Sequence, residues 1–167
     1  KSQEANLLVI TRSEKSGNIY KKINIKNKLE LQKISDFSVD CCLINLMGGT
    51  PNEIVDTGKV IVDAIQASIL KPKKYVYLSS MSVYDNETSQ LLKEDMSFDW
   101  KQPTTYGSAK IFVEKLMEER LRSIVPVVCL RPGRVYGLEG LPWFKRIENL
   151  VKSGRMSYLT SSCKGKS

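Results

Sequence analysis

Residues 39–46 have the sequence Val39-Asp-Cys-Cys-Leu-Ile-Asn-Leu46, and this stretch decides the fold. Its nearly continuous hydrophobicity is typical of a central strand in a parallel sheet, where both faces of the strand are covered. A break at Gly48-Gly49-Thr50-Pro51-Asn52 follows, and residues 54–70 then place apolar side chains at helical spacing. A buried strand followed by a helix is the repeating unit of a parallel α/β sheet.

The same alternation of strand and helix continues on both sides of this stretch. Further strands are predicted at residues 6–11, 19–25, 75–79 and 127–131, and further helices at residues 28–34, 106–124 and 143–151. The helix at 106–124 carries its apolar side chains in a single stripe, so we expect one of its faces to be buried. The pattern predicts an α/β protein with an open, doubly wound parallel sheet over residues 1–138, and residues 139–167 begin a second region.

The composition excludes several classes of site. The chain has no histidine, which rules out histidine-based triads and histidine-ligated metals and leaves acid-base chemistry to tyrosine, lysine or carboxylates. The four cysteines, Cys41, Cys42, Cys129 and Cys163, show no metal-ligand spacing, so we predict no metal site. No run approaches the roughly 20 apolar residues of a membrane span. Because no secretory signal opens the chain, we expect a cytoplasmic protein.

The net charge of +8 is confined to the two ends of the chain. Residues 1–38 hold eight basic against four acidic residues, and residues 139–167 hold six against two. These ends contain few aromatic residues among scattered lysines. The charge therefore indicates solvated surface, or attraction of an anionic substrate or cofactor, rather than binding of nucleic acid.

One predicted helix turn carries a phenol and an ammonium. Tyr106-Gly-Ser-Ala-Lys110 places Tyr106 and Lys110 four residues apart, on one helix face. A phenol is a weak base at neutral pH, and a nearby ammonium favours its ionised form. The pair alone is not specific. It follows a strand that ends in the hydroxyl-rich stretch Leu78-Ser79-Ser80-Met81-Ser82-Val83-Tyr84, however, and ligands bind at the carboxyl ends of such strands.

Three motifs in this order resemble the extended short-chain dehydrogenase/reductase family, the NAD-dependent epimerase/dehydratase group. They are Val76-Tyr-Leu-Ser-Ser-Met-Ser-Val-Tyr84, Tyr106-Gly-Ser-Ala-Lys110 and Leu130-Arg-Pro-Gly-Arg-Val-Tyr-Gly137, with Asp56-Thr-Gly58 earlier in the chain. The resemblance covers nearly the whole chain and implies a Rossmann-like fold. It also implies a homodimer formed through the helices at 54–70 and 106–124.

The resemblance assigns catalytic roles by motif position. Tyr106 would be the general acid/base that exchanges a proton with the substrate, and Lys110 would tune it and hydrogen-bond the nicotinamide ribose. Ser80 would hold the substrate oxygen, with Ser79 and Ser82 as its neighbours. The implied reaction is hydride transfer between a substrate carbon and the nicotinamide, for which the protein supplies placement and the proton.

The resemblance also assigns positions that contact the cofactor. Leu46, Met47 and Gly48 correspond to a segment that passes beneath it, and Pro132 corresponds to a position near the carboxamide. Arg12, with Ser13 beside it, corresponds to the position that meets the adenine ribose. A guanidinium there suits the 2′-phosphate of NADP, whereas NAD sites favour a carboxylate. We therefore expect NADP, with NAD as the alternative; the other interpretation of Arg12 is a solvated charge at a strand end.

The sequence departs from the family's pattern in three places. No Gly-x-x-Gly-x-x-Gly or Gly-x-Gly-x-x-Gly occurs, so the loop that would bind a pyrophosphate is missing. We expect the first strand, its glycine turn and the first helix to lie upstream of Lys1, the alternative being a relative that lost its cofactor site. Lys26-Asn27 stands where the family often has an aspartate near adenine. Met81-Ser82 stands where sugar dehydratases have Asp-Glu, which argues against water elimination.

These observations predict an NAD(P)-dependent epimerase or reductase that acts on an alcohol or carbonyl carbon of a small molecule, with a nucleotide sugar as the implied substrate. The alternative from another class is a non-catalytic relative that binds RNA or a protein partner through its basic ends.

Overall fold

The computed structural model describes residues 8–11, 20–25, 27–84, 92–96, 98, 102–133 and 142–154. The chain divides into two compact units, Lys1–Pro132 and Gly133–Ser167. The candidate site residues that the structure describes all belong to the first unit. Arg12 and Ser13 lie outside the described residues.

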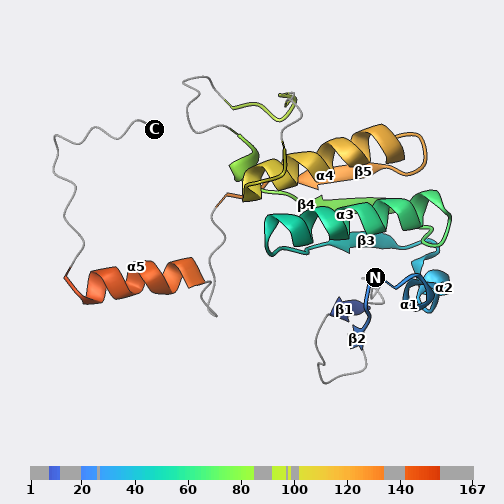
Figure 1. Ribbon diagram of the computed structural model, residues 1–167, viewed down its shortest axis with the longest axis horizontal. Helices are drawn as coiled ribbons and strands as arrows, with labels where there is room; N and C mark the ends of the chain where they lie inside the picture. Colours follow the sequence, from blue (N-terminus) through green and yellow to red (C-terminus); the bar gives the residue numbers. More distant parts are fainter. Residues whose placement is uncertain are drawn as a thin grey trace, which may run out of the picture. The chain divides into compact units, whose positions relative to one another are not determined.

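Among the described residues of the first unit, five parallel strands form two sheets. They are β1 (Val9–Thr11), β2 (Tyr20–Lys22), β3 (Cys42–Asn45), β4 (Lys74–Leu78) and β5 (Val127–Leu130). β1 pairs with β2, and the second sheet has the order β3-β4-β5 (Figure 1). In that sheet Ile44 lies beside Val76, and Val76 lies beside Val128, so that alternate residues of the three strands share a face.

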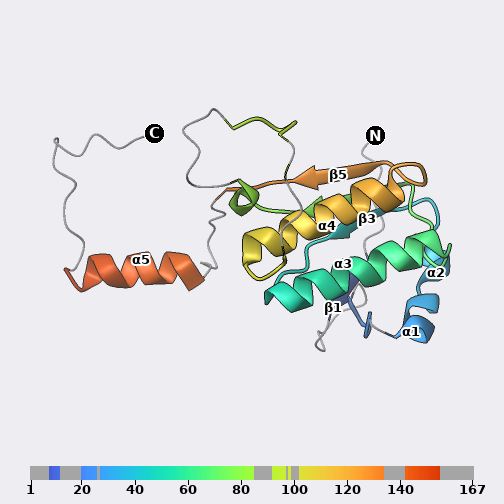
Figure 2. The ribbon, with the colours of Figure 1, turned by 45° about the horizontal axis from the view of Figure 1, so that its top comes forward.

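The helices follow the strands as the sequence predicts. They are α1 (Lys28–Gln32), α2 (Ser35–Ser38), α3 (Pro51–Gln66), the 3₁₀ turn η1 (Met81–Val83), α4 (Tyr106–Leu121) and, in the second unit, α5 (Pro142–Lys152). α3 and α4 lie side by side along one face of the β3-β4-β5 sheet (Figure 2). None of the described helices is both long enough and apolar enough to span a membrane.

The helix predicted at 54–70 begins and ends earlier than its apolar pattern suggested. It begins at Pro51 because the Thr50 hydroxyl accepts from Glu53 N while the Glu53 carboxylate accepts from Thr50 N, which together form a capping box. It ends at Gln66 because the N–H groups of Ile69 and Leu70 both donate to Ala64 O, at 2.9 and 3.1 Å, and close the last turn. Apolar spacing marks the buried face of a helix, whereas the caps set its ends.

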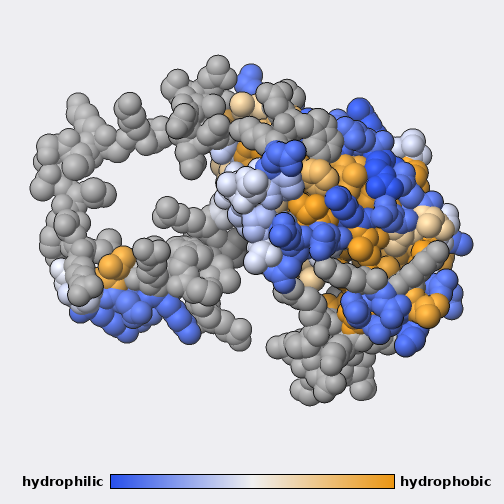
Figure 3. Space-filling view, in the orientation of Figure 1, coloured by the Kyte–Doolittle hydropathy of each residue, from blue (hydrophilic) through white to orange (hydrophobic). Residues whose placement is uncertain are grey.

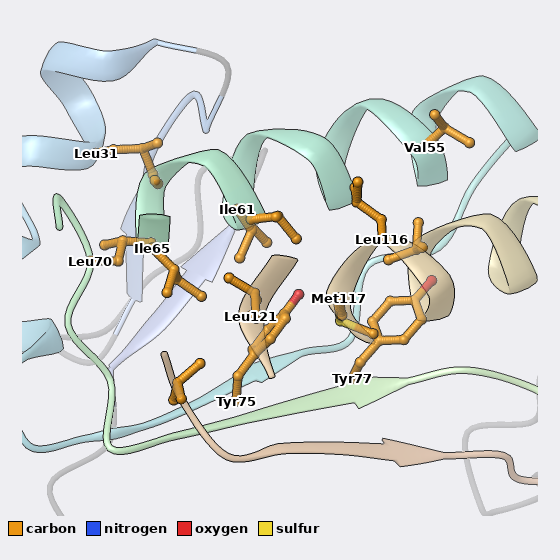
Figure 4. Close-up of a cluster of buried hydrophobic side chains, with 14 of the residues drawn as sticks. Leu31, Val55, Ile61, Ile65, Leu70, Tyr75, Tyr77, Leu116, Met117 and Leu121 are labelled. Atoms are coloured by element: carbon orange, nitrogen blue, oxygen red, sulfur yellow. The ribbon is translucent and has the colours of Figure 1, made fainter. Parts of the chain in front are cut away.

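The core lies between the sheet and the pair α3 and α4. Tyr75 and Tyr77 project from β4 into this layer, where both are fully buried among side chains of the two helices (Figure 4). The helices approach closely at Gly58, where an added Cβ would lie 2.6 Å from a Val113 methyl carbon. The missing side chain at Gly58 therefore lets the two helices pack closely.

The opposite face of the same sheet is exposed over the residues that the structure describes. Ile44 of β3 is 55% exposed and Leu130 of β5 is 48% exposed, and Leu46, directly after β3, is 66% exposed. The sequence predicted strands covered on both faces, and the described residues cover only the face that α3 and α4 occupy. The outer surface of these two helices mixes hydrophilic and hydrophobic residues (Figure 3).

Candidate active site

Three chain segments meet at the carboxyl end of β4. Ser79 N donates to Leu130 O at 2.7 Å, and Met81 N donates to Pro132 O at 3.0 Å, so the chain leaving β4 stays hydrogen-bonded to the chain leaving β5. The turn η1 then packs against the first turn of α4, where an added Cβ at Gly107 would collide with Ser82 O. The hydroxyl-rich stretch and the Tyr106-Lys110 pair, which are far apart in the sequence, are therefore neighbours.

Lys110 lies at the centre of this arrangement. Its side chain is only 2% exposed, and Nζ donates to Leu78 O at 2.7 Å and to Met47 O at 3.3 Å. Nζ also lies 4.7 Å from the ring centroid of Tyr77 and 5.7 Å from that of Tyr106. Burial lowers the pKa of Lys110 to about 8, partly opposed by the charge of Glu114. The lysine that links the ends of β3 and β4 is thus a buried cation, and its pKa lies above neutral pH.

Tyr106 is the first residue of α4. The residue before it, Thr105, caps the helix by accepting from Ser108 N, and the Ser108 hydroxyl accepts from Thr105 N in return. These bonds fix the backbone from which the Tyr106 ring projects, and 43% of Tyr106 is exposed. The phenol is therefore accessible from solvent, while the ammonium beside it is not.

Ser80 lies at the start of η1. Its Oγ accepts from Ser82 N at 3.1 Å and lies 3.1 Å from Ser82 Oγ, to which it donates. The neighbouring Ser79 is buried, and its hydroxyl has no hydrogen-bond partner among the described residues. Of the three serines in this stretch, Ser80 is half-buried and fixed by the turn, whereas Ser82 is exposed.

The predicted cofactor positions that the structure describes lie around the same strand ends. Met47 offers its carbonyl oxygen to Lys110, and its N–H donates to the Asn45 side chain at 2.9 Å. Leu46 is largely exposed, and a Cβ added at Gly48 would meet no atom within 4 Å. Pro132 contributes the carbonyl oxygen that accepts from Met81 N.

Sequence reasoning missed a cluster around Arg131, which directly follows β5. Its guanidinium donates to both carboxylate oxygens of Glu114, at 3.2 and 2.8 Å, and to the hydroxyl of Tyr84 at 2.8 Å. Glu114 is buried on α4, one turn beyond Lys110. The available signal was a carboxylate at position 114, between the apolar positions Val113 and Met117 of the predicted buried stripe.

The described residues form an α/β protein in which a tyrosine and a lysine of one helix lie at the carboxyl ends of parallel strands. The chain belongs to the NAD dependent epimerase/dehydratase family, whose sequence pattern matches residues 2–159. This match confirms the family resemblance and the Rossmann-like fold that the motifs predicted. A search of curated proteins found no match.

Two solved structures have the same fold. One is a proposed epimerase from Burkholderia cenocepacia J2315, with 14% sequence identity, a TM-score of 0.66, and coverage of 89% of this chain and 52% of that one. The other is UDP-glucuronic acid 4-epimerase from Bacillus cereus in complex with NAD, with 24% identity, a TM-score of 0.60, and coverage of 80% of this chain and 45% of that one. This chain therefore spans about half the length of each structure.

Proposed function

We propose that the protein is an NAD(P)-dependent epimerase or reductase of the short-chain dehydrogenase type, acting on an alcohol or carbonyl carbon. The observation that carries the proposal is the position of Lys110 Nζ, which is buried beneath two main-chain carbonyl groups and 5.7 Å from the ring of Tyr106. A buried cation beside an accessible phenol is the arrangement that general acid-base chemistry by a tyrosine requires. A nucleotide sugar is the proposed substrate class, supported by the Bacillus cereus structure, which is a UDP-glucuronic acid epimerase.

The described residues fit the nicotinamide end of a dinucleotide. An ammonium has three hydrogens, and the two carbonyl groups take two, so Lys110 retains one donor for a ribose hydroxyl. The open space at Gly48 allows close approach of a flat group to the backbone. The cofactor would supply the redox chemistry at the substrate carbon.

The identity of the cofactor is a separate proposal. We favour NADP over NAD because the guanidinium of Arg12 suits a 2′-phosphate, whereas the related Bacillus cereus epimerase holds NAD. Ser13 would assist Arg12, and Leu46, Met47 and Pro132 would line the nicotinamide end. Measuring the dissociation constants of the two dinucleotides in wild type and in Arg12→Ala would decide between them. Tighter binding of NADP than of NAD by wild type, with the NADP affinity lost in Arg12→Ala, supports the proposal. Tighter binding of NAD by both proteins contradicts it.

Three side chains, those of Tyr106, Ser80 and Lys110, would have separate roles in proton transfer. The phenol of Tyr106 would exchange a proton with the substrate oxygen, because its side chain reaches solvent while its backbone is held by the cap at Thr105. The hydroxyl of Ser80 would rotate from Ser82 Oγ to the substrate oxygen and hold it near the phenol. Lys110 would keep a positive charge beside the phenol throughout.

The partners of the protein follow from the same proposal. A small-molecule substrate is expected, and the mixed surface of α3 and α4 (Figure 3) is where a homodimer of the family type would form. Cytoplasmic location and the absence of nucleic acid binding stay predictions. On the full-length protein, gel filtration tests the proposed homodimer, and an RNA-binding measurement tests the absence of nucleic acid binding.

The decisive experiment replaces Tyr106 by phenylalanine in the full-length protein. Turnover should fall to background, while the change in nicotinamide fluorescence on cofactor binding should persist, because only the proton-carrying hydroxyl is removed. Ser80→Ala should lower kcat more than Ser82→Ala, because the proposal assigns the substrate oxygen to the Ser80 hydroxyl. Turnover that survives in Tyr106→Phe contradicts the proposal, and RNA or protein binding without cofactor binding favours the non-catalytic alternative.

A further inference from the structure

Arg131 joins four separate parts of the first unit. Besides its two bonds to the Glu114 carboxylate on α4, its Nη1 donates to the hydroxyl of Tyr84 and, at 3.0 Å, to Glu94 O. Its guanidinium carbon lies 5.3 Å from the ring centroid of Tyr84 and 4.9 Å from that of Phe98. One side chain therefore connects the end of β5, helix α4, the residue after η1 and, further along the chain, Glu94 and Phe98.

The partner of Arg131 on α4 is held firmly. Glu114 is buried, and a buried carboxylate is costly unless a cation pairs with it in good geometry. The two parallel bonds from the guanidinium, at 3.2 and 2.8 Å, have the bidentate form that an ammonium cannot reproduce. Arg131 is thus fixed relative to α4, the helix that also carries Tyr106 and Lys110.

Tyr84 connects Arg131 to the turn η1, which begins directly after Ser80. Its N–H donates to Met81 O at 3.1 Å and closes η1, while its hydroxyl accepts from Arg131 and donates to Lys93 O at 3.2 Å. Tyr84 also contacts Phe98 edge to face, with ring centroids 5.5 Å apart. The far end of η1, opposite Ser80, is therefore held by a residue whose own hydroxyl depends on Arg131.

We propose that Arg131 is a positioning residue that sets the Ser80–Tyr84 turn and the segment at 92–96 against α4, and so determines how Ser80 faces Tyr106. The proposal rests on the function proposed above. Arg131 touches no reacting group in this scheme; it acts through Tyr84. Because η1 meets α4 at Ser82 and Gly107, a small rotation of the turn about that contact moves Ser80 relative to the phenol.

The kinetic test uses Arg131→Lys in the full-length protein. We expect kcat to fall roughly 10- to 100-fold, the range that a displacement of about 1 Å at a reacting group produces, while the dissociation constant of the cofactor stays unchanged. Tyr84→Phe removes one hydroxyl and should lower kcat in the same direction by a smaller factor. Combined with Arg131→Lys, it should add little, because both act through one contact.

Arg120→Lys is the matched control. Arg120 also lies on α4 and also donates to a carboxylate and an amide oxygen, but these belong to Asp63 and Gln66 on α3 rather than to η1. Its substitution should leave kcat unchanged. If Arg120→Lys lowers kcat as much as Arg131→Lys, or if Arg131→Lys and Tyr84→Phe reduce only the melting temperature, the positioning role is overturned.

A second measurement, hydrogen exchange, does not require turnover. Hydrogen exchange on the full-length protein should show faster exchange at residues 81–84 and 92–96 in Arg131→Lys and in Tyr84→Phe, and wild-type exchange there in Arg120→Lys. Unchanged exchange at these residues overturns the proposal. If the wild-type protein shows no turnover, the proposed function is contradicted. The exchange pattern still decides whether Arg131 holds the turn.

Discussion

Gly107 in the first turn of α4 lies directly against the main-chain carbonyl oxygen of Ser82 in η1. The contact joins two backbones, so neither side can yield by rotating a side chain. We predict that Gly107→Ala lowers the free energy of unfolding by about 1–3 kcal/mol, as overpacking at a rigid contact does. Chemical denaturation measures this change.

The matched control for Gly107 is Gly48→Ala, where an added Cβ would meet no atom within 4 Å. It should change the unfolding free energy by less than about 0.5 kcal/mol, as substitutions in open space do. Equal losses in the two variants would show that the η1 contact is not tight.

Two buried tyrosines of β4 differ in one hydrogen bond. The hydroxyl of Tyr75 accepts from Asn45 Nδ2 at 3.0 Å, whereas that of Tyr77 has no partner among the described residues. An unsatisfied buried hydroxyl is costly, and a satisfied one contributes about 1 kcal/mol. Tyr77→Phe should therefore raise the melting temperature and Tyr75→Phe should lower it, as differential scanning calorimetry can measure. Changes in the same direction would contradict this assignment.

The contact between α3 and α4 depends on a missing side chain at Gly58. A Cβ there would lie 2.6 and 2.8 Å from the two Val113 methyl carbons. Gly58→Ala should destabilise the protein by about 1–3 kcal/mol despite the better helix propensity of alanine. The loss should shrink in a Val113→Ala background, and a double-mutant cycle measures that coupling. Additive losses would show that the two residues do not meet.

The buried ammonium of Lys110 makes stability depend on pH. Burial lowers the pKa of Lys110 from 10.5 to about 8, so between these values the unfolded chain binds more protons than the folded one. Stability from this group therefore rises with pH across that window, and the penalty of the buried charge is complete below pH 8. We predict that Lys110→Met gains stability relative to wild type at pH 7 and loses that advantage towards pH 10.5.

Melting temperatures recorded over this pH series test the prediction. Lys71→Met, which removes an exposed lysine away from the buried site, is the control for loss of a lysine side chain. An advantage of Lys110→Met that does not vary between pH 7 and 10.5 would mean that the carbonyl groups of Met47 and Leu78 fully replace water around the charge.

The alternation of strands and helices could be predicted because it depends on local hydrophobic spacing. The buried positions of α3 and α4, such as Ile61, Val113 and Met117, follow from that spacing. The ends of the helices could not be predicted, because they depend on caps such as the Thr50 and Glu53 pair. The turn η1 was missed because three residues are too few to show a period.

The candidate site could be predicted only in part. Tyr106 and Lys110 share a helix face by spacing alone, and the motif order placed Ser80 near them. The carbonyl acceptors of Lys110 and the bond between Arg131 and Glu114 join residues far apart in the sequence, and no local pattern specifies such pairs. Glu114 lies on a buried stripe where an apolar residue was expected, and only its partner explains it.

The hydrogen bonds from the Lys110 ammonium to two main-chain carbonyl groups have a consequence for ligand affinity. A ribose hydroxyl would join a cation that already has two oxygen neighbours, so the arriving nucleotide would replace little hydration and gain little attraction from this charge. Most of the affinity for the nucleotide must therefore come from contacts with other groups along the dinucleotide. In exchange, the electrostatic setting of the phenol would be ready in the empty protein and unchanged from one catalytic cycle to the next.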